Sequence, residues 1–506
     1  METLSLLLTG IYTAATTPTL LTAVTMGAVL GLLVGALPGL GPAAGVAIML
    51  PVAVGFEPTI TLALLAGVYY GAMFGGAVTA ILIGIPGDAP AVMTVLDGHP
   101  LALKGDAGRA LGVAIYSSFF GGLAGLIGLT LLAQIIARYA LMFGPAEMTA
   151  LMALSLSLVS TLGTKDRAKS FTALALGLWL GTIGLDQIRG GPRFTFGQME
   201  LFSGLDFAVV AVGMFGLGQM LQTVGSAPTT RTQSASYSYR SMMPRLSDLW
   251  ICRKVMFMGS IMGFIIGVLP GVGATAATMM SYATAKKISK NSDQFGHGAI
   301  EGVAAPETAN NSASYGAMVT LFTLGIPASA TTAVLFAGLL MAGLQPGPRL
   351  FQEHSEFVWA LFGTFYVGNF VLVFITLFLT PVLAAAIFVS RGLLFSAVIG
   401  IVVYGMFSID YSLWAVVIML LAGILGYIMN LLKYPSVPLI LGLVLGPLFE
   451  LGIRRTLIAS RGDFTVFLDH AIAMVVFGIT AMVVLVPILI RKCRLPRNEK
   501  AVATES

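Results

Sequence analysis

Long apolar segments alternate with short polar ones along almost the whole chain. A helix crosses the hydrocarbon core of a bilayer in about 20 residues. Segments that suit such helices occupy residues 18–37, 59–83, 110–137, 145–162, 170–188, 205–224, 255–269, 299–325, 328–344, 356–389, 393–407, 412–432, 436–449 and 467–490. The pattern predicts an all-α polytopic membrane protein with about 10–14 transmembrane or re-entrant helices. The segment 356–389 fits one long tilted helix or two short ones.

Composition narrows the class of protein further. Hydrophobic residues make up 57% of the 506 residues and charged residues only 10%, against roughly 25% charged residues in soluble domains. This balance excludes a soluble enzyme, a nucleic-acid-binding protein and a disordered chain. The net charge of +5 does not indicate nucleic acid, because Lys and Arg lie in short loops and tails.

One polar break divides the chain. Residues 225–254 contain five basic residues and one acidic residue, and the start of the C-terminal tail is also basic. Because basic residues collect on cytoplasmic flanks, we expect the break and the C-terminus in the cytoplasm and the N-terminus outside. The N-terminal residues lack a positive region, so no cleavable signal peptide is expected. The predicted parts are a first transmembrane repeat 1–224, a linker 225–254, a second transmembrane repeat 255–490 and a cytoplasmic tail 491–506.

The two halves repeat two motifs in the same order. Residues 26–41 (MGAVLGLLVGALPGLG) and 258–273 (MGSIMGFIIGVLPGVG) are identical at eight of 16 positions, at an offset of 232. Residues 78–90 and 319–331 are identical at six of 13 positions, at an offset of 241, and YGAM precedes both. Duplicated halves with apolar segments that Gly and Pro interrupt are typical of secondary transporters. We therefore expect two pseudo-symmetric repeats.

Four Gly/Pro motifs are expected to break helices: LPGLGP (37–42), GIPGDAP (84–90), LPGVGA (269–274) and GIPASA (325–330). Non-helical backbone at membrane depth must be buried in protein or line a water-filled cavity. Its free carbonyls can hold a cation such as Na⁺, and the amides of the next helix can hold an anion. The alternatives are packing kinks or plain loops. The candidate backbone positions are Pro38, Gly39, Gly41, Pro86, Gly87, Pro270, Gly271, Gly273 and Pro327.

Polar side chains near these motifs are candidates for substrate or ion binding. The carboxylates are Asp88, Asp97, Glu301 and Glu307, because a carboxylate at membrane depth is costly and usually functional. Residues 97–100 (DGHP) resemble a turn, with a structural role favoured for His99.

The segment 304–316 is the richest, with Glu307, Thr308, Asn310, Asn311 and Ser312 beside an apolar run. Amides and hydroxyls suit a carboxylate or a dehydrated Na⁺, although an ordinary polar helix start is the alternative. Adjacent Asn residues on a helix point about 100° apart. One is therefore expected to face the site, and the other to satisfy the backbone.

Other charged groups suggest structural roles. Glu450 and Arg454 are four residues apart and can pair on one helical face, and Asp186, Arg189 and Arg193 form a second charged group. The chain contains no phosphate-binding loop, HExxH or CxxC motif. We therefore expect no enzyme activity, no catalytic residue and no cofactor besides a coupling ion, Na⁺ or H⁺.

Six long motifs resemble one known family. They are GALPGLGPAAGVAIMLP, YYGAMFGGAVTAILIGIPGDAP, DGHPLALKGDAGRALG, GTIGLDQIRGGPRFTFG, EGVAAPETANNSASYGAMVTLFTLGIP and LGLVLGPLFELGIRRTL. They are similar to the large membrane subunit of tripartite tricarboxylate transporters, the TctA family, over about residues 18–470. One departure is Ala328, which stands where the family pattern favours Gly.

The resemblance implies a multi-pass permease of a bacterial inner membrane. It implies uptake of tricarboxylates such as citrate, or of related organic acids, driven by an ion gradient. It also implies two partners, a small membrane subunit of about four spans and a periplasmic solute-binding protein. The sequence is thus interpreted as a secondary active transporter. An uncoupled organic-anion channel and a membrane-embedded enzyme are the alternatives.

Overall fold

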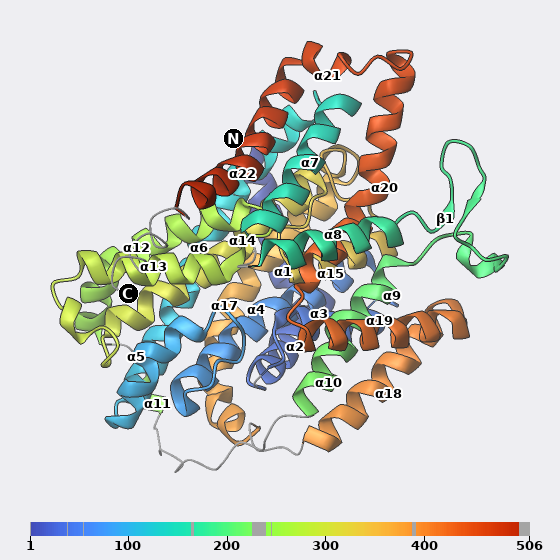
Figure 1. Ribbon diagram of the computed structural model, residues 1–506. Coiled ribbons are helices and arrows are strands. Elements are labelled where there is room, and N and C mark those ends of the chain that lie inside the picture. Colours follow the sequence, from blue (N-terminus) through green and yellow to red (C-terminus); the bar gives the residue numbers. More distant parts are fainter. Residues whose placement is uncertain are drawn as a thin grey trace, which may run out of the picture. The chain divides into compact units, whose positions relative to one another are not determined.

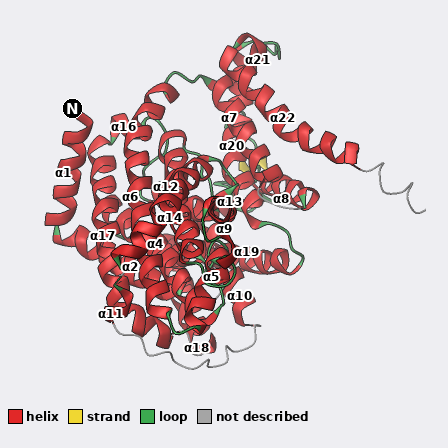
Figure 2. Ribbon diagram, turned by 90° about the vertical axis from the view of Figure 1, so that its left-hand side faces the viewer, coloured by secondary structure: helices red, strands yellow, loops and turns green. Residues whose placement is uncertain are grey.

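The computed structural model describes residues 2–37, 39–53, 55–162, 166–224, 239–243, 245–386 and 391–494. Helices dominate this part of the chain (Figure 2), and the described strands are the two-residue pair β1 (Gly184–Leu185) and β2 (Pro192–Arg193). Seven of the described helices are long and apolar enough to cross a membrane, and further apolar helices are shorter. These features confirm the predicted all-α polytopic membrane fold.

The described chain divides into two compact units, and the first combines residues 1–141 with 205–436. Its elements are α1 (Glu2–Thr16), α2 (Pro18–Gly35), α3 (Pro42–Ala53), α4 (Pro58–Ile83), α5 (Val92–Leu103), α6 (Ala107–Ala140), α9 (Phe207–Ala211), the π-helical η2 (Val212–Leu217), α10 (Gly218–Val224), α11 (Tyr239–Met242), α12 (Leu246–Val268), α13 (Gly273–Ile288), η3 (Ser292–Gln294), α14 (Ile300–Leu324), α15 (Ala330–Met341), α16 (Leu350–Glu353), α17 (Ser355–Ala386), α18 (Arg391–Asp410) and α19 (Leu413–Leu431).

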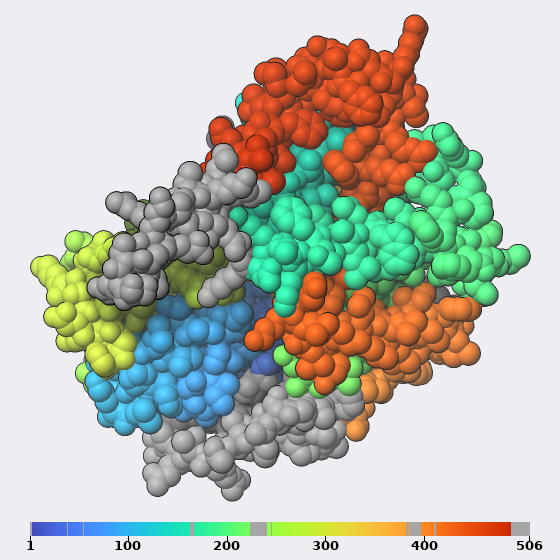
Figure 3. Space-filling view, viewed as in Figure 1, coloured from blue at the N-terminus to red at the C-terminus, as the bar shows by residue number. Residues whose placement is uncertain are grey.

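The second unit combines residues 142–204 with 437–506. It contains α7 (Pro145–Leu162), α8 (Arg167–Leu180), the β1–β2 hairpin, η1 (Met199–Leu201), most of α20 (Ser436–Ala459), α21 (Val466–Asp469) and α22 (Ala471–Arg494). The segment that carries the hairpin lies at the surface, in green at the right of Figure 3. Within this unit Gly177 of α8 packs directly on the backbone of α20 at Leu439, which a larger side chain would prevent.

Among the long helices of the first unit, α4 and α14 (labelled in Figure 1) are buried along most of their length. Helix α4 packs against α2, α3 and α17, and α14 packs against α5, α6, α12 and α13. Both are rich in Gly and Ala, and small residues allow helix backbones to approach closely. Tyr70 of α4, Tyr315 of α14 and Phe365 of α17 pack their rings together between these helices.

The pair α2 and α4 makes the same contacts as the pair α12 and α14. In both pairs, three glycines spaced four residues apart lie so close to the partner that an added Cβ would overlap its main chain. In the first pair these contacts are Gly27 with Leu64, Gly31 with Val68 and Gly35 with Ala72; in the second they are Gly259 with Ala305, Gly263 with Ala309 and Gly267 with Ala313.

The two sets of contacts correspond at the offsets found in the sequence. Gly27 and Gly259 differ by 232, and Leu64 and Ala305 differ by 241. The order of helices also repeats, since α2–α5 and α12–α15 succeed one another with the same breaks between them. The shared YGAM motif is out of register with this correspondence, because Tyr70 and Tyr315 differ by 245, one helical turn more.

Several elements differ from the expected segments. The sequence analysis did not predict helices α1, α3, α5 and α13, and segment 356–389 forms the single helix α17 as far as it is described. Helix α12 begins at Leu246, inside the expected linker 225–254, because its first turns carry basic side chains that can extend to a polar boundary. Residues 225–238 and 244 of that linker, and residues 495–506 of the tail, lie outside the described residues. The boundaries of the two sequence repeats stay a prediction.

Candidate functional site

The helices end at the four Gly/Pro motifs. Helix α2 ends before LPGLGP, where Gly39 has φ +88°, and α12 ends before LPGVGA, where Gly271 and Gly273 have φ +79° and +71°. Helices α4 and α14 are capped at their C-termini by left-handed glycines, Gly84 and Gly325. Only glycine adopts this backbone conformation at little cost. Pro38 lies outside the described residues.

The two breaks of each repeat meet in space. In the first repeat, buried Gly87 packs on the carbonyl end of Gly35, and Gly41 faces Asp88, with an added Cβ 3.8 Å from the Cβ of Asp88. Half-buried Pro86 precedes this contact. The two motifs of the first repeat therefore build one region of non-helical backbone.

In the second repeat the backbone N–H of Gly271 donates to the carbonyl of Ala328 at 2.9 Å. Pro270 and Pro327, the prolines of these two loops, are both buried. The contact uses the carbonyl of Ala328, so the methyl group of this residue does not prevent it.

Two buried carboxylates lie beside these breaks. Glu307 of α14 is 1% exposed and accepts hydrogen bonds from Thr94 of α5 at 2.5 Å and Ser118 of α6 at 3.0 Å. Asp88 is also buried; its Oδ1 accepts the N–H of Ala91 at 3.1 Å, while Oδ2 has no partner. The two groups lie close enough to interact electrostatically. Neither takes part in a salt bridge among the described residues.

The polar segment of α14 is buried throughout. Asn310 is 1% exposed, and neither atom of its amide group has a partner. The side chain of Asn311 donates to the carbonyl of Glu307 at 3.1 Å. Thr308 and Ser312 donate to the carbonyls of Ala304 and Ser260. The segment is therefore a helix interior rather than a polar helix start, and Asn310 is its one member whose side chain has no described partner.

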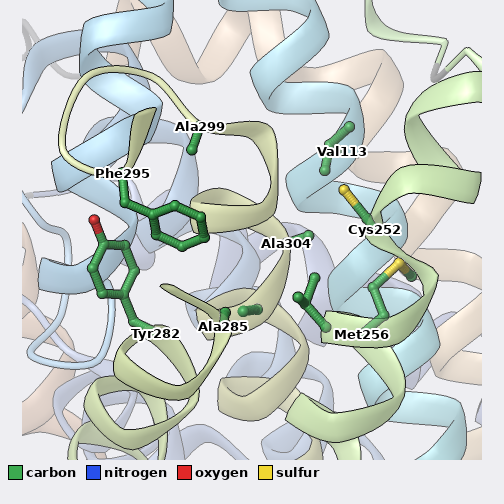
Figure 4. Packing of buried hydrophobic residues seen from close by; sticks show 10 residues of the cluster. Val113, Cys252, Met256, Tyr282, Ala285, Phe295, Ala299 and Ala304 are labelled. Carbon is green, nitrogen blue, oxygen red and sulfur yellow. The ribbon is translucent and has the colours of Figure 1, made fainter. Parts of the chain in front are cut away.

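Asp97 does not belong to this region. The expected turn at residues 97–100 is wrong, since these residues lie within α5, where Pro100 does not interrupt the described helix. The carboxylate of Asp97 accepts the backbone N–H groups of Gly296, Gly298 and Ala299 and the hydroxyl of Tyr282, all at 2.8 Å. Figure 4 shows Tyr282 with its hydroxyl at the edge of an apolar cluster that Phe295 joins. Asp97 thus holds the loop that precedes α14.

Two other candidates also make structural contacts. The Nδ1 atom of His99 lies 3.1 Å from the carbonyl of Ile81, at the end of α4. Glu301 accepts a hydrogen bond from Ser289 at 2.5 Å. The first contact joins α5 to the end of α4, and the second joins the end of α13 to the start of α14, which agrees with the structural role favoured for His99.

Four further residues of this region were not predicted from the sequence: Thr94, Ser118, Tyr69 and Ser329. Thr94 and Ser118 lie on helices outside the Gly/Pro motifs, so only the fold brings them to Glu307. Tyr69 lies within hydrogen-bonding reach of Ser329 and within electrostatic range of Asp88. Ser329 could have been found from the sequence, because it lies 241 residues after Asp88, and 241 residues is the offset of the repeat.

The charged groups of the second unit form a separate network. Arg454 donates to Asp186 at 2.8 Å and to Glu450 at 2.9 Å, and Arg193 also donates to Glu450. Hydrogen bonds from the backbone N–H of Arg189 and from Arg454 hold the pKa of Asp186 well below its usual range. The expected pairing of Glu450 with Arg454 is confirmed, and the network ties the hairpin to α20.

Known proteins are similar to this chain over most of its length. The model of the tripartite tricarboxylate transporter TctA family matches residues 21–441. An uncharacterized 52.8 kDa protein in the TAR-I ttuC' 3' region of Agrobacterium vitis is 37% identical over 453 residues, 88% of each chain. A second uncharacterized protein, in the TAR-II ttuC' 3' region of the same organism, is 38% identical over 227 residues, 45% of this chain and 94% of that protein.

No solved structure matches the chain. Within the described residues, no group of three or more His, Cys, Asp or Glu side chains could hold a metal ion. The family match spans both pairs of broken helices, and the helices confirm a multi-pass membrane protein. The chain therefore belongs to the tripartite tricarboxylate transporter TctA family, as a membrane component of a transporter.

Proposed function

We propose that the chain is the large permease subunit of a secondary active transporter that imports tricarboxylates such as citrate, or related organic acids. One observation carries the proposal: two buried polar groups have no partner among the described residues, namely Asp88 Oδ2 in a helix break and the Asn310 amide inside α14. Buried polar groups are nearly always satisfied. Groups left open beside non-helical backbone support a site that a transported solute or ion completes.

The coupling ion would bind at the acidic part of this region. Asp88 and Glu307 are buried carboxylates with no salt bridge among the described residues. A charge buried in this way is costly until a proton or a cation compensates it. Carbonyls of the broken helices can complete the shell of a Na⁺ ion. No cofactor other than this ion, Na⁺ or H⁺, is part of the proposal.

Two partners complete the proposed system in a bacterial inner membrane. They are a small membrane subunit of about four spans and a periplasmic solute-binding protein that delivers the organic acid. The family name describes a tripartite transporter, which supports the presence of two further components.

Reconstitution tests this function. The chain and the small subunit are placed in liposomes, and uptake of radiolabelled citrate is followed with or without the binding protein and with a Na⁺ or a proton gradient. We expect accumulation against the citrate gradient only when both the binding protein and one ion gradient are present. Downhill flux alone would indicate a channel. Uptake at the full rate without the binding protein would contradict the tripartite mechanism.

A further inference from the structure

Asp88 and Ser329 occupy equivalent positions in the two repeats, 241 residues apart. Oδ1 of Asp88 accepts the backbone N–H of Ala91 at 3.1 Å, and the hydroxyl of Ser329 accepts that of Thr332 at 3.2 Å. Ala91 and Thr332 are also 241 residues apart. Both side chains therefore bond the backbone three residues ahead in the same way. The difference is that Asp88 carries a second oxygen and a negative charge.

The side chain of Asp88 lies beside the residue that precedes α3. The side chain faces Gly41, and Oδ2 is buried without a partner. The equivalent of Gly41 is Gly273, at an offset of 232, and there an added Cβ would meet no atom within 4 Å. The Asp88 side chain thus adjoins the start of α3, whereas no atom lies close to an added Cβ at the start of α13.

Helix α13 begins at this open position. It has 16 residues, and its N-cap residue Val272 offers no side-chain hydrogen bond to the first turn. The first N–H groups of a helix have no partner inside the helix, and the helix dipole makes this end attractive to an anion. Gly273 has φ +71° and no side chain of its own to cover these N–H groups.

A second, independent feature points to the same place. Asn310 is 1% exposed, and both its amide nitrogen and its amide oxygen lack partners. Ala313, about one turn further along α14, packs in a cluster with Val272 and Ala274 at the start of α13. The equivalent of Asn310 in the first repeat is Tyr69, which lies within reach of both Ser329 and Asp88. Asn310 therefore lies on the part of α14 near the open N-terminus.

We propose that the N-terminus of α13, with Gly273, Ser329 and Asn310, binds one carboxylate group of the substrate. In the first repeat the side chain of Asp88 lies beside the equivalent position, Gly41, just before α3. Backbone N–H groups, a hydroxyl and an amide are neutral donors, which suits a carboxylate. This inference rests on the proposed function for the identity of the substrate, whereas the preference for an anion at α13 does not depend on it.

Ser329→Asp tests the inference directly, because it gives the second repeat the carboxylate of the first. Asp keeps the capping bond to Thr332, since Asp and Ser are both good N-cap residues. Ser329→Asn is the matched comparison, similar in size and capping but without charge. Both changes are made in a full-length chain in which Cys252 and Cys493 are replaced by Ser and Ala274→Cys supplies a single thiol at the start of α13.

The measurement compares two thiol reagents, an anionic and a cationic methanethiosulfonate, on the reconstituted protein. With Ser329 in place we expect the anionic reagent to be favoured. Ser329→Asp should lower the ratio of the anionic reaction rate to the cationic reaction rate by about tenfold or more. A nearby unit negative charge raises the free energy of an anion by more than about 1.4 kcal/mol at an effective dielectric constant of about 20. Ser329→Asn should change the ratio less than about threefold.

Equal ratios in the Asp and Asn variants would overturn the inference. Citrate is then added as a competitor, and we expect it to slow the anionic reagent with Ser329 but not with Ser329→Asp. An intact charge effect with no protection by citrate would support the anion site and overturn citrate as its occupant. The failure of the inference and the failure of the proposed substrate are therefore separate results.

Discussion

A buried amide normally satisfies both its oxygen and its nitrogen, because an unpaired buried group costs about 1–3 kcal/mol. Asn311 follows this rule in part, since its nitrogen donates to the carbonyl of Glu307. Asn310 does not, since neither of its amide atoms has a partner. Two adjacent and chemically identical side chains therefore have different roles, which the 100° separation along a helix allows.

The two asparagines should respond differently to alanine. In Asn310→Ala we expect normal abundance and a half-saturation raised by about 10- to 150-fold, because a hydrogen bond to a charged partner contributes about 1.5–3 kcal/mol. In Asn311→Ala we expect lower thermal stability by about 1 kcal/mol and an unchanged half-saturation. Concentration-dependent citrate uptake and thermal unfolding check both. Unchanged values in both variants would remove this segment from the proposed site.

The left-handed glycines give a second prediction at this scale. Gly39→Val and Gly271→Val place a β-branched side chain at φ +88° and +79°, which costs about 1–3 kcal/mol at each position. We expect both variants to insert and to lose uptake, because the loops can no longer hold their shape. Gly400→Val is the control, since this glycine lies in α18 with no atom near an added Cβ. Near-normal uptake by both loop variants would show that these breaks are only connections.

Part of the site could be found from single residues. Gly and Pro predict where the backbone leaves the helix, because their conformational limits are local. The burial of Asp97 against Gly296, Gly298 and Ala299 could not be found in this way, since its partners lie about 200 residues away. The four-residue DGHP sequence instead suggested a turn, and helix packing overrode that local preference.

At the scale of the element, glycines spaced four residues apart determine which helices pair. Such a spacing places them on one face of a helix. On α2 and on α12 this face lies against the backbone of the next long helix. Long apolar segments of the sequence located most of these long helices within a few residues. They missed α3 and α13, because α3 is too short to cross a membrane and α13 is rich in Ala and Thr.

The glycine contacts predict matched losses of stability in the two repeats. Gly31→Leu and Gly263→Leu would push apart backbones that now touch, and overpacking of this kind costs about 1–3 kcal/mol or more. We expect both variants to unfold several degrees lower in detergent, as measured by size-exclusion chromatography after heating. Gly400→Leu makes the same change where the space is open and should leave the unfolding temperature within about one degree. A shift in only one repeat would contradict equivalent packing.

At the scale of the whole molecule, the compact units do not coincide with the halves of the sequence. The first unit takes residues 1–141 and 205–436, so it contains both pairs of broken helices. Sequence order alone could not show this division, because residues 142–204 and 437–506 are far apart in the chain and come together only in the fold. An internal repeat in the sequence shows that a group of helices was duplicated. A compact unit instead depends on which helices pack together.

The carboxylate of Asp97 joins the two repeats within the first unit. It lies on α5, and its four partners belong to α13 and to the loop before α14. Hydrogen bonds to a charged group contribute about 1.5–3 kcal/mol, and Asp97 is fully buried. Losing the charge therefore weakens a connection between the repeats, while the hydrogen bonds of Asp88 and Glu307 involve other residues.

Asp97→Asn should destabilise the protein by about 1.5–3 kcal/mol, because the hydrogen bonds of Asp97 hold the two repeats together. The half-saturation for citrate should change little, because Asp97 does not touch the proposed site. Asp293→Asn is the matched control, since Asp293 lies exposed in the same loop region. Thermal unfolding and citrate uptake are measured on both variants. A large rise in half-saturation in Asp97→Asn at unchanged stability would place Asp97 in the binding site instead. Equal unfolding temperatures for the two variants would show that this contact does not stabilise the unit.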